Sequence, residues 1–278
     1  QPNELGILAA DFFLKFLGIK KVTWSGKVVR SIEVKAGRKT KTISEKHTEE
    51  IPGYIIMRDF ERKGRPIAWV FGGKTSSRDG KTITKNDLKR RIKKSANYNL
   101  LKEGLCYPYF YSTLPATLRA EMAEAVTLAQ ERAQSIRTKR ELNAKLKELQ
   151  TEAEAAGTPV PKKYPNIWSY DKTLKGIRIN ELKDITEEGE IWPYLFRRII
   201  RYWYEENMGR YYENIRQKRD YDSTIEHKVD LDRFFETSNP YLFVVRDRDF
   251  YRLDQIVEIK GGRLKMLYPP QTLVFLSF

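Results

Sequence analysis

Two β-rich segments, Ile51–Met57 and Ile67–Phe71, flank a short cationic turn, and this pattern constrains the fold more than any other part of the chain. Apolar and β-branched runs on either side of a turn predict a β-hairpin. Gly64 gives the turn a residue that tolerates a positive φ angle, and Arg65 follows directly. Arg65 is therefore expected at a strand start, where its fork of donors and permanent charge suit a phosphate. The alternative is an ordinary surface arginine in a turn.

Charge and composition narrow the class of protein. The chain has 278 residues and a net charge of +15, which attracts polyanions, nucleic acid first and acidic membranes second. Apolar residues make up 40% and aromatic residues 12%, so the chain is expected to fold rather than to form a basic tail. One cysteine excludes an internal disulfide, and two histidines cannot build a Cys/His zinc site. No stretch is long and apolar enough to span a bilayer.

Periodicity predicts the elements of the first half. Apolar residues at helical spacing from Leu5 to Leu17 indicate an amphipathic helix that Gly18 ends. Strands are expected at residues 22–24 and 28–34, and the polar segment Lys35–Glu50 is expected to be a mobile loop. Further expected elements are a basic helix at 85–94, an extended aromatic segment at 104–111, a helix at 118–133 and a helical insertion at 134–163.

The second half has a different character. Residues 191–204 form an aromatic helical pattern, with Arg197, Arg198 and Arg201 on another face as a candidate second patch for nucleic acid or a partner. Strands are expected at 241–245, around a two-residue Gly261-Gly262 turn, and at the end of the sequence. A domain boundary is expected near residue 175.

Three segments, taken in order, resemble the staphylococcal-nuclease (thermonuclease) family of phosphodiesterases. They are the turn ending Gly64-Arg65 with its apolar strand, the helix end and strand Asn99–Tyr109, and Asn166-Ile167-Trp168-Ser169. The resemblance covers residues 1–175 and is strongest to longer bacterial members with a C-terminal extension, which includes a segment similar to Trp192–Arg198. It implies an α+β fold: an OB-fold-like small β-barrel with packed helices over 1–175, lacking its N-terminal strands, a helical insertion at about 134–163, and an α+β extension of unassigned role over 176–278.

The resemblance also implies roles for individual residues. In the family, the arginine matching Arg65 stabilises the phosphate of the transition state. Residues matching Arg62 and Lys63 contact the terminal phosphate, although Lys63 replaces the family's usual tyrosine. The tyrosines matching Tyr107 and Tyr109 face the nucleotide, where an aromatic ring stacks on any base.

The resemblance implies calcium as a cofactor but supplies no ligand for it here. The family's calcium-binding aspartates precede the opening helix, where this chain begins, so no metal ligand is expected in this chain. The first barrel strands would be missing with them, which would leave sheet edges open. An upstream segment, another chain or the recruited C-terminal strands would then complete the barrel. Trp168 is expected in the core.

The leading functional expectation is hydrolysis of DNA or RNA with calcium assistance and Arg65 as the transition-state stabiliser. Lys89, Arg90 and Lys93 of the basic helix are candidate phosphate contacts, against the common case of a solvated face. The alternative is a non-catalytic module for nucleic-acid binding or assembly on the same barrel. A third reading is a structural subunit whose open barrel pairs with another chain. A cytoplasmic location is favoured, with secretion left open.

Other polar residues are expected to be structural. Three Asp-x-Asp pairs lie at 220 and 222, 230 and 232, and 247 and 249. We expect their side chains to form solvated ion pairs rather than a metal site, because Arg248 interleaves with the last pair and Arg246 lies beside it. His47 and His227 have no companions at ligand spacing, and Cys106 is expected to be a buried, inert thiol.

Overall fold

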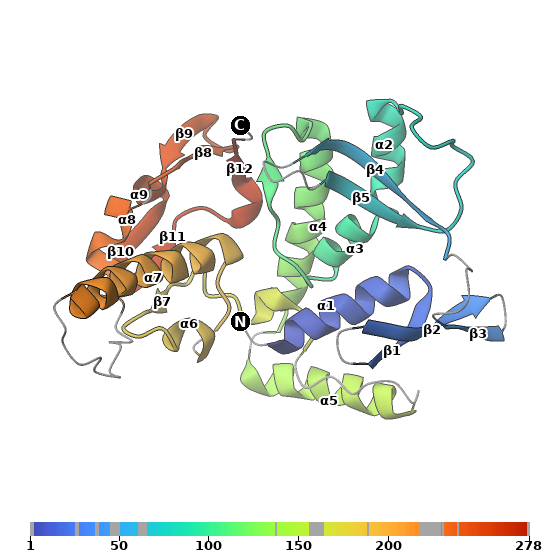
Figure 1. The fold of residues 1–278 in the computed structure, drawn as a ribbon, viewed down its shortest axis with the longest axis horizontal. Helices are drawn as coiled ribbons and strands as arrows, with labels where there is room; N and C mark the ends of the chain where they lie inside the picture. The colour runs from blue at the N-terminus through green and yellow to red at the C-terminus, as the bar shows by residue number, and fades with distance from the viewer. Residues whose placement is uncertain are drawn as a thin grey trace. The chain divides into compact units, whose positions relative to one another are not determined.

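A computed structural model describes residues 3–25, 28–36, 39–44, 51–60, 66–136, 138–155, 164–187, 189–216, 229, 231–237 and 239–276. Helices mix with several separate sheets, so the α+β class is confirmed (Figure 1). The chain divides into two compact units. The N-terminal unit comprises Asn3–Cys106 and Thr113–Asn166, and the C-terminal unit comprises Tyr107–Ser112 and Ile167–Ser277.

The N-terminal unit contains five helices and five strands among its described residues. The helices are α1 (Asn3–Phe16), α2 (Lys85–Ile92), α3 (Ala96–Lys102), α4 (Ala116–Gln134) and α5 (Lys139–Ala155). The strands are β1 (Ile19–Ser25), β2 (Val28–Ala36), β3 (Lys39–Ser44), β4 (Gly53–Phe60) and β5 (Pro66–Gly72). The amphipathic first helix and the helical insertion are thus both present.

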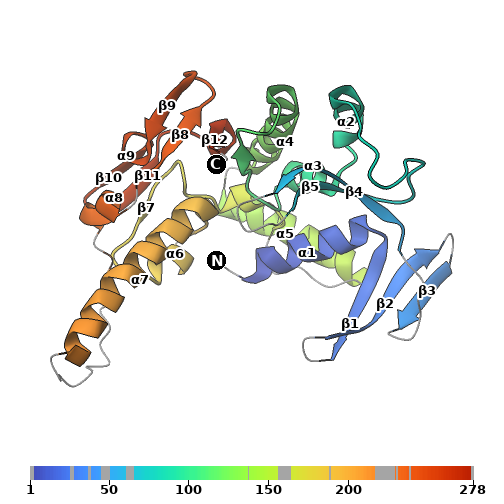
Figure 2. The ribbon, with the colours of Figure 1, turned by 45° about the horizontal axis from the view of Figure 1, so that its top comes forward.

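The expected mobile loop at 35–50 is wrong for its first part. Residues 39–44 form β3, which pairs antiparallel with β2 from Ser31↔Ser44 to Ala36↔Lys39. Together with β1 these strands form an antiparallel meander, seen at the right of Figure 2. The reason is local: Lys39–Ser44 alternates lysine with threonine before Ile43, and threonine favours strands. The prediction of a loop from charge alone is therefore wrong for residues 39–44.

The expected hairpin at 51–71 is confirmed. Strands β4 and β5 pair antiparallel from Gly53↔Gly72 to Phe60↔Pro66, and Tyr54 stacks on the buried Phe71 with ring centroids 4.8 Å apart. The other face of β4 is open to solvent, because Ile55 is 57% exposed and Met57 is 46% exposed. The two sheets of this unit remain separate, and the described strands form no closed barrel.

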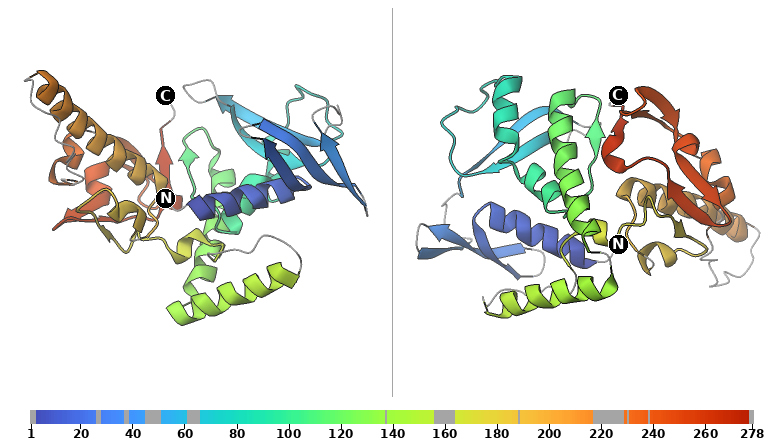
Figure 3. Two further views of the ribbon diagram at one scale, coloured as in Figure 1. Left: turned by 60° about the horizontal axis from the view of Figure 1, so that its bottom comes forward. Right: turned by 180° about the vertical axis from the view of Figure 1, so that it is seen from behind.

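Hydrogen bonds at the helix ends fix the boundaries of α2 and α3. Thr84 caps α2 by accepting from Asp87 N, and Ser95 caps α3 by accepting from Tyr98 N, each at 3.1 Å. Gly104 ends α3 with φ +70°, while Leu105 N donates to Leu100 O, which is the arrangement of a Schellman motif. Helix α3 packs on α4, whose buried stripe includes Leu118, Met122, Val126 and Ala129 as the sequence predicts (Figure 3).

The C-terminal unit is built on two small sheets. Its strands are β6 (Phe110–Tyr111), β7 (Ile177–Arg178), β8 (Tyr241–Val244), β9 (Asp249–Arg252), β10 (Val257–Lys260), β11 (Arg263–Met266) and β12 (Leu273–Phe275). Its helices are α6 (Asp184–Glu187), α7 (Pro193–Arg216), α8 (Phe234–Thr237) and α9 (Leu253–Ile256), with single 3₁₀ turns at Ile167–Ser169, Leu231–Arg233 and Pro270–Thr272. Gly261 and Gly262, both at positive φ, form the expected turn between β10 and β11.

Strand β6 belongs to the sheet β6-β12-β8-β9 of the C-terminal unit. It pairs in parallel with β12 through Val274↔Phe110 and Phe275↔Tyr111. The aromatic segment that the resemblance places in residues 1–175 is therefore held by a strand near the end of the chain. Among the described strands, the N-terminal sheets β1-β2-β3 and β4-β5 take in no C-terminal strand, so how the expected barrel would be completed stays a prediction.

Candidate nucleic-acid interface

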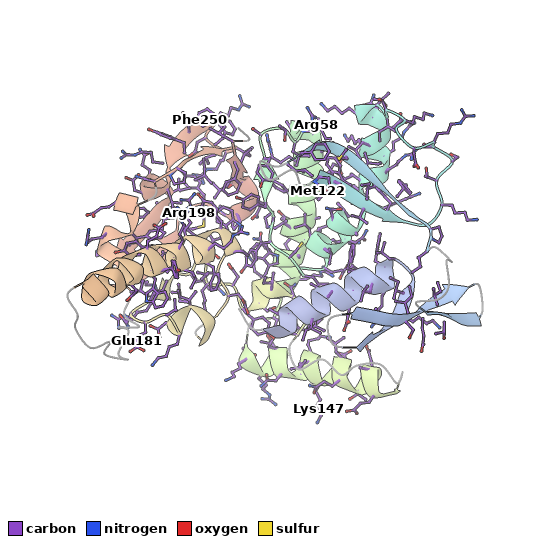
Figure 4. All side chains as sticks on the ribbon, viewed as in Figure 1. Arg58, Met122, Lys147, Glu181, Arg198 and Phe250 are labelled. Atoms are coloured by element: carbon purple, nitrogen blue, oxygen red, sulfur yellow. The ribbon has the colours of Figure 1, made fainter. Side chains whose placement is uncertain are left out.

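The residues with the most specific predicted roles are not among those that the structure describes. Arg62, Lys63 and Arg65 fall within 61–65, between the paired strands β4 and β5. His47, His227 and the acidic residues at 220, 222 and 230 are outside them as well. Arg58, labelled on β4 in Figure 4, is the nearest described arginine along the chain and is exposed.

The three candidate cations on and just after helix α2 are paired with carboxylates. Lys93 Nζ lies 3.0 Å from Glu121 Oε2, Lys89 Nζ lies 3.7 Å from Glu121 Oε1, and Arg90 pairs with Asp87. Hydrogen bonding to Glu121 raises the pKa of Lys93. Such exposed pairs contribute little to stability. A phosphate approaching this helix would nevertheless compete with carboxylates already in place.

Tyr107 is engaged by a buried polar network. Its hydroxyl donates to Asp171 Oδ1 at 2.6 Å, and its ring meets the buried Trp168 edge-on at 4.9 Å. Thr173 Oγ1 also donates to Asp171 Oδ1, at 2.5 Å, and accepts from Trp192 N at 2.8 Å. Burial, followed by the nearby Asp171 charge, raises the pKa of Tyr107 well above its usual value. Trp168 lies in the core, as expected.

The buried carboxyl of Asp171 gives a pH prediction. Burial outweighs the hydrogen bonds from Thr173 and Tyr107 and raises the pKa of Asp171. A raised folded-state pKa means that the carboxyl's favourable contribution is present at low pH and is lost as pH rises from the ordinary 3.8 through the folded-state value. Asp171→Asn should therefore gain stability relative to the parent as pH is raised above 3.8, as measured by urea unfolding. A stability difference independent of pH would contradict this assignment.

Tyr109 lies in a different environment, a group of rings and guanidinium groups that we call the tyrosine–arginine cluster. Its members are Tyr109, Tyr111, Tyr194, Phe275, Arg197 and Arg198. The Tyr109 ring is stacked on Phe275 at 4.0 Å with an interplanar angle of 8°, and 37% of the residue is exposed. The guanidinium of Arg197 lies 5.7 Å from the Tyr109 centroid, and that of Arg198 lies 4.9 Å from the Tyr194 centroid.

The cluster brings together two features that the sequence suggested separately, the nucleotide-facing Tyr109 and the Arg197-Arg198 patch. Tyr109 directly precedes strand β6, and the two arginines lie on helix α7. Phe275 and Tyr194 were not singled out from the sequence. Phe275 joins the cluster because β12 pairs with β6, and no local sequence pattern indicates that pairing.

The electrostatics of the cluster are cationic. Within the described ranges no carboxylate pairs with Arg197 or Arg198, whereas Arg201 Nε on the same helix lies 2.6 Å from Glu205 Oε1. Burial raises the pKa of Tyr109 to about 12, so the phenol keeps its proton at neutral pH. Tyr109 therefore offers a donor without adding negative charge.

Two of the resembling segments pack directly on each other. Gly104, at the end of α3, has no room for a side chain, because a Cβ there would lie 2.5 Å from Asn166 Oδ1. The Asn166 amide donates to Ala129 O of α4 at 2.9 Å. The segments 99–109 and 166–169 thus meet at Gly104 and Asn166, and again at Tyr107 and Trp168.

The remaining candidates have structural surroundings. Asp247 accepts from Arg246 Nε at 2.9 Å and from the Tyr268 hydroxyl at 2.6 Å, in keeping with the expected charge pairs. Burial raises the pKa of Cys106 to about 12, which keeps the thiol protonated. Among the described residues, no three His, Cys, Asp or Glu side chains gather in a way that could hold a metal ion.

No protein-family model, no curated protein and no solved structure matches this chain. A search of the described helices for one long and apolar enough to cross a membrane found none.

Proposed function

We propose that this protein is a phosphodiesterase of the staphylococcal-nuclease type that hydrolyses DNA or RNA, with an OB-fold-like arrangement of its N-terminal unit. The observation that carries the proposal is the contact between Gly104 and Asn166. Both residues belong to the segments on which the resemblance rests, and the glycine is required there by its positive φ and by the close approach of Asn166. Two of the three segments chosen from sequence alone therefore contact each other.

In this proposal Arg65 is the catalytic cation. Charge builds on the phosphate oxygens as water attacks a phosphodiester, and a fixed guanidinium stabilises that charge. Arg62 and Lys63 hold a neighbouring phosphate, and Tyr109 contacts the nucleotide. The described residues do not supply a calcium site, so no step is assigned to calcium here. In this proposal carboxylates from an upstream segment or another chain bind it.

The test is cleavage of DNA and RNA by the full-length protein in the presence of calcium. Arg65→Ala should lower the rate at least about a hundredfold, because one preorganised donor to a developing oxyanion is worth that much. Arg65→Lys should stay impaired, since an ammonium lacks the paired donors. Arg58→Ala removes an exposed charge from the adjacent strand β4 and should leave the rate near that of the parent. Undiminished calcium-stimulated cleavage by Arg65→Ala would exclude the assigned role.

A second candidate is a non-catalytic module for nucleic-acid binding or assembly. The tyrosine–arginine cluster favours this candidate. Aromatic rings beside guanidinium groups that have no carboxylate partner can bind a polyanion without catalysing a reaction. This candidate predicts salt-sensitive binding of nucleic acid and no turnover with any divalent metal. The same cleavage assay separates the two.

A further inference from the structure

Arg197 and Arg198 are placed where an anion is favoured. Helix α7 begins at Pro193, its first turn contains no acidic residue, and both arginines follow that turn. Helical side chains tilt toward the N-terminus, so these two reach back over the first turn. The N-terminal end of a helix is itself partly positive, which makes two cations without a counter-charge unfavourable and a bound anion favourable.

The rings hold the guanidinium groups in place. Arg197 lies over Tyr109 and Arg198 over Tyr194, within the range of a cation–π contact. A guanidinium has five N–H donors, so a contact with one ring leaves donors for phosphate oxygens. The ring contacts also restrict the side chains before any ligand arrives, which lowers the entropy lost on binding.

Within the described residues, Arg178, Arg248 and Arg263 of the same unit also lack a carboxylate partner, so Arg197 and Arg198 are set apart from them by their place over tyrosine rings. Other arginines of the unit are paired. Arg201 pairs with Glu205, Arg246 with Asp247, and Arg252 with Asp254. Arg197 and Arg198 have no such carboxylate partner within the described ranges. Beside them Tyr109 is partly exposed, with a protonated hydroxyl as a further donor. Figure 4 labels Arg198 on α7.

We propose that the tyrosine–arginine cluster is a binding site for the phosphate backbone of single-stranded nucleic acid, with Arg197 and Arg198 on the phosphates and Tyr109 against the adjoining nucleotide. The site rests on the proposed function for its ligand class. It goes beyond that function because it gives a binding role to helix α7 of the C-terminal unit, to which the proposed function assigns none.

The test measures binding of a short fluorescent single-stranded oligonucleotide to the full chain by anisotropy. Chelator is present so that no cleavage occurs. Arg197→Gln with Arg198→Gln should weaken binding about tenfold or more. It should also make the slope of log affinity against log salt shallower by about 1.4, since each phosphate contact on a single strand contributes about 0.7. Arg201→Gln, on the same helix but paired with Glu205, is the matched control and should change neither quantity.

Two further variants test the proposal if the double glutamine variant folds poorly. Arg197→Lys with Arg198→Lys should keep the salt slope while losing part of the affinity, because the charge stays and the fork is lost. Tyr109→Leu should weaken binding of the oligonucleotide more than binding of polyphosphate, which has no bases and loses only the ring that positions Arg197. A glutamine pair that folds and binds with the parent's affinity and salt slope would overturn the proposal. So would a loss seen only with anionic lipid vesicles or polyglutamate.

The outcomes for this site and for the proposed function are separable. The glutamine pair should weaken oligonucleotide binding in chelator by the same factor in the parent and in Arg65→Ala, because the two sites are independent. If Arg65→Ala cleaves normally, the catalytic proposal fails while the binding result stands. If the glutamine pair binds normally, the cluster proposal fails whatever the cleavage assay shows.

Discussion

Trp192→Ala should lower the free energy of unfolding of the C-terminal unit by about 3–5 kcal/mol, the usual cost of removing a large buried aromatic side chain. Trp192 is 1% exposed and packs in the unit's core. Its ring lies 5.0 Å from Tyr194 and 5.5 Å from Phe275. Its Nε1 donates to Pro108 O at 3.2 Å, so the variant loses a buried hydrogen bond as well as apolar contacts.

Guanidinium-induced unfolding followed by circular dichroism measures this effect, with the transition of the C-terminal unit fitted on its own. Tyr204→Ala is the control, because Tyr204 is on helix α7 but 56% exposed, and its loss should change stability by no more than about 0.5 kcal/mol. A loss below about 1 kcal/mol for Trp192→Ala would show that its surroundings are not the packed core described above.

Gly104→Ala is expected to destabilise the N-terminal unit by about 2–4 kcal/mol. The positive φ alone costs an alanine about 1–3 kcal/mol. The new methyl group would also lie 2.5 Å from Asn166 Oδ1 and displace the side chain whose amide donates to Ala129 O. An unsatisfied buried group adds about 1–3 kcal/mol, less whatever local relaxation recovers.

Gly80→Ala separates the two causes in the same measurement. Gly80 has φ +73°, close to that of Gly104, but a Cβ there would meet nothing within 4 Å. Urea unfolding should therefore show the smaller, conformational cost for Gly80→Ala and a clearly larger one for Gly104→Ala. Adding Asn166→Ala to Gly104→Ala should cost less than the sum of the single changes, since the steric conflict disappears. Equal losses at the two glycines would contradict the close contact.

The sequence predicted elements whose signals are local. The glycine pair between β10 and β11, the apolar stripe of α4 and the burial of Trp168 are all confirmed. The prediction of a loop at 35–50 is wrong for residues 39–44, because the strand preference of threonine outweighs the effect of the charges there. The barrel itself, the catalytic role of Arg65 and the domain boundary near residue 175 stay predictions.

The candidate site depended on contacts that are remote in sequence. Lys89 and Lys93 looked like free cations, and nothing near them in the chain indicated that Glu121 of α4 would pair with both. Tyr109 and Arg197 were each noted for their residue type, but their meeting required β6 to join the C-terminal unit. Pairing between distant strands is set by tertiary packing, which single-sequence periodicity does not encode.

The position of β12 between β6 and β8 has a consequence for biosynthesis. During translation the segment containing β6 emerges long before its hydrogen-bonding neighbour exists. Tyr109 and Tyr111 must then wait, without their sheet, until β12 has been made. Contacts so distant along a chain close slowly. The cluster of rings and arginines is consequently assembled only after synthesis has passed Phe275.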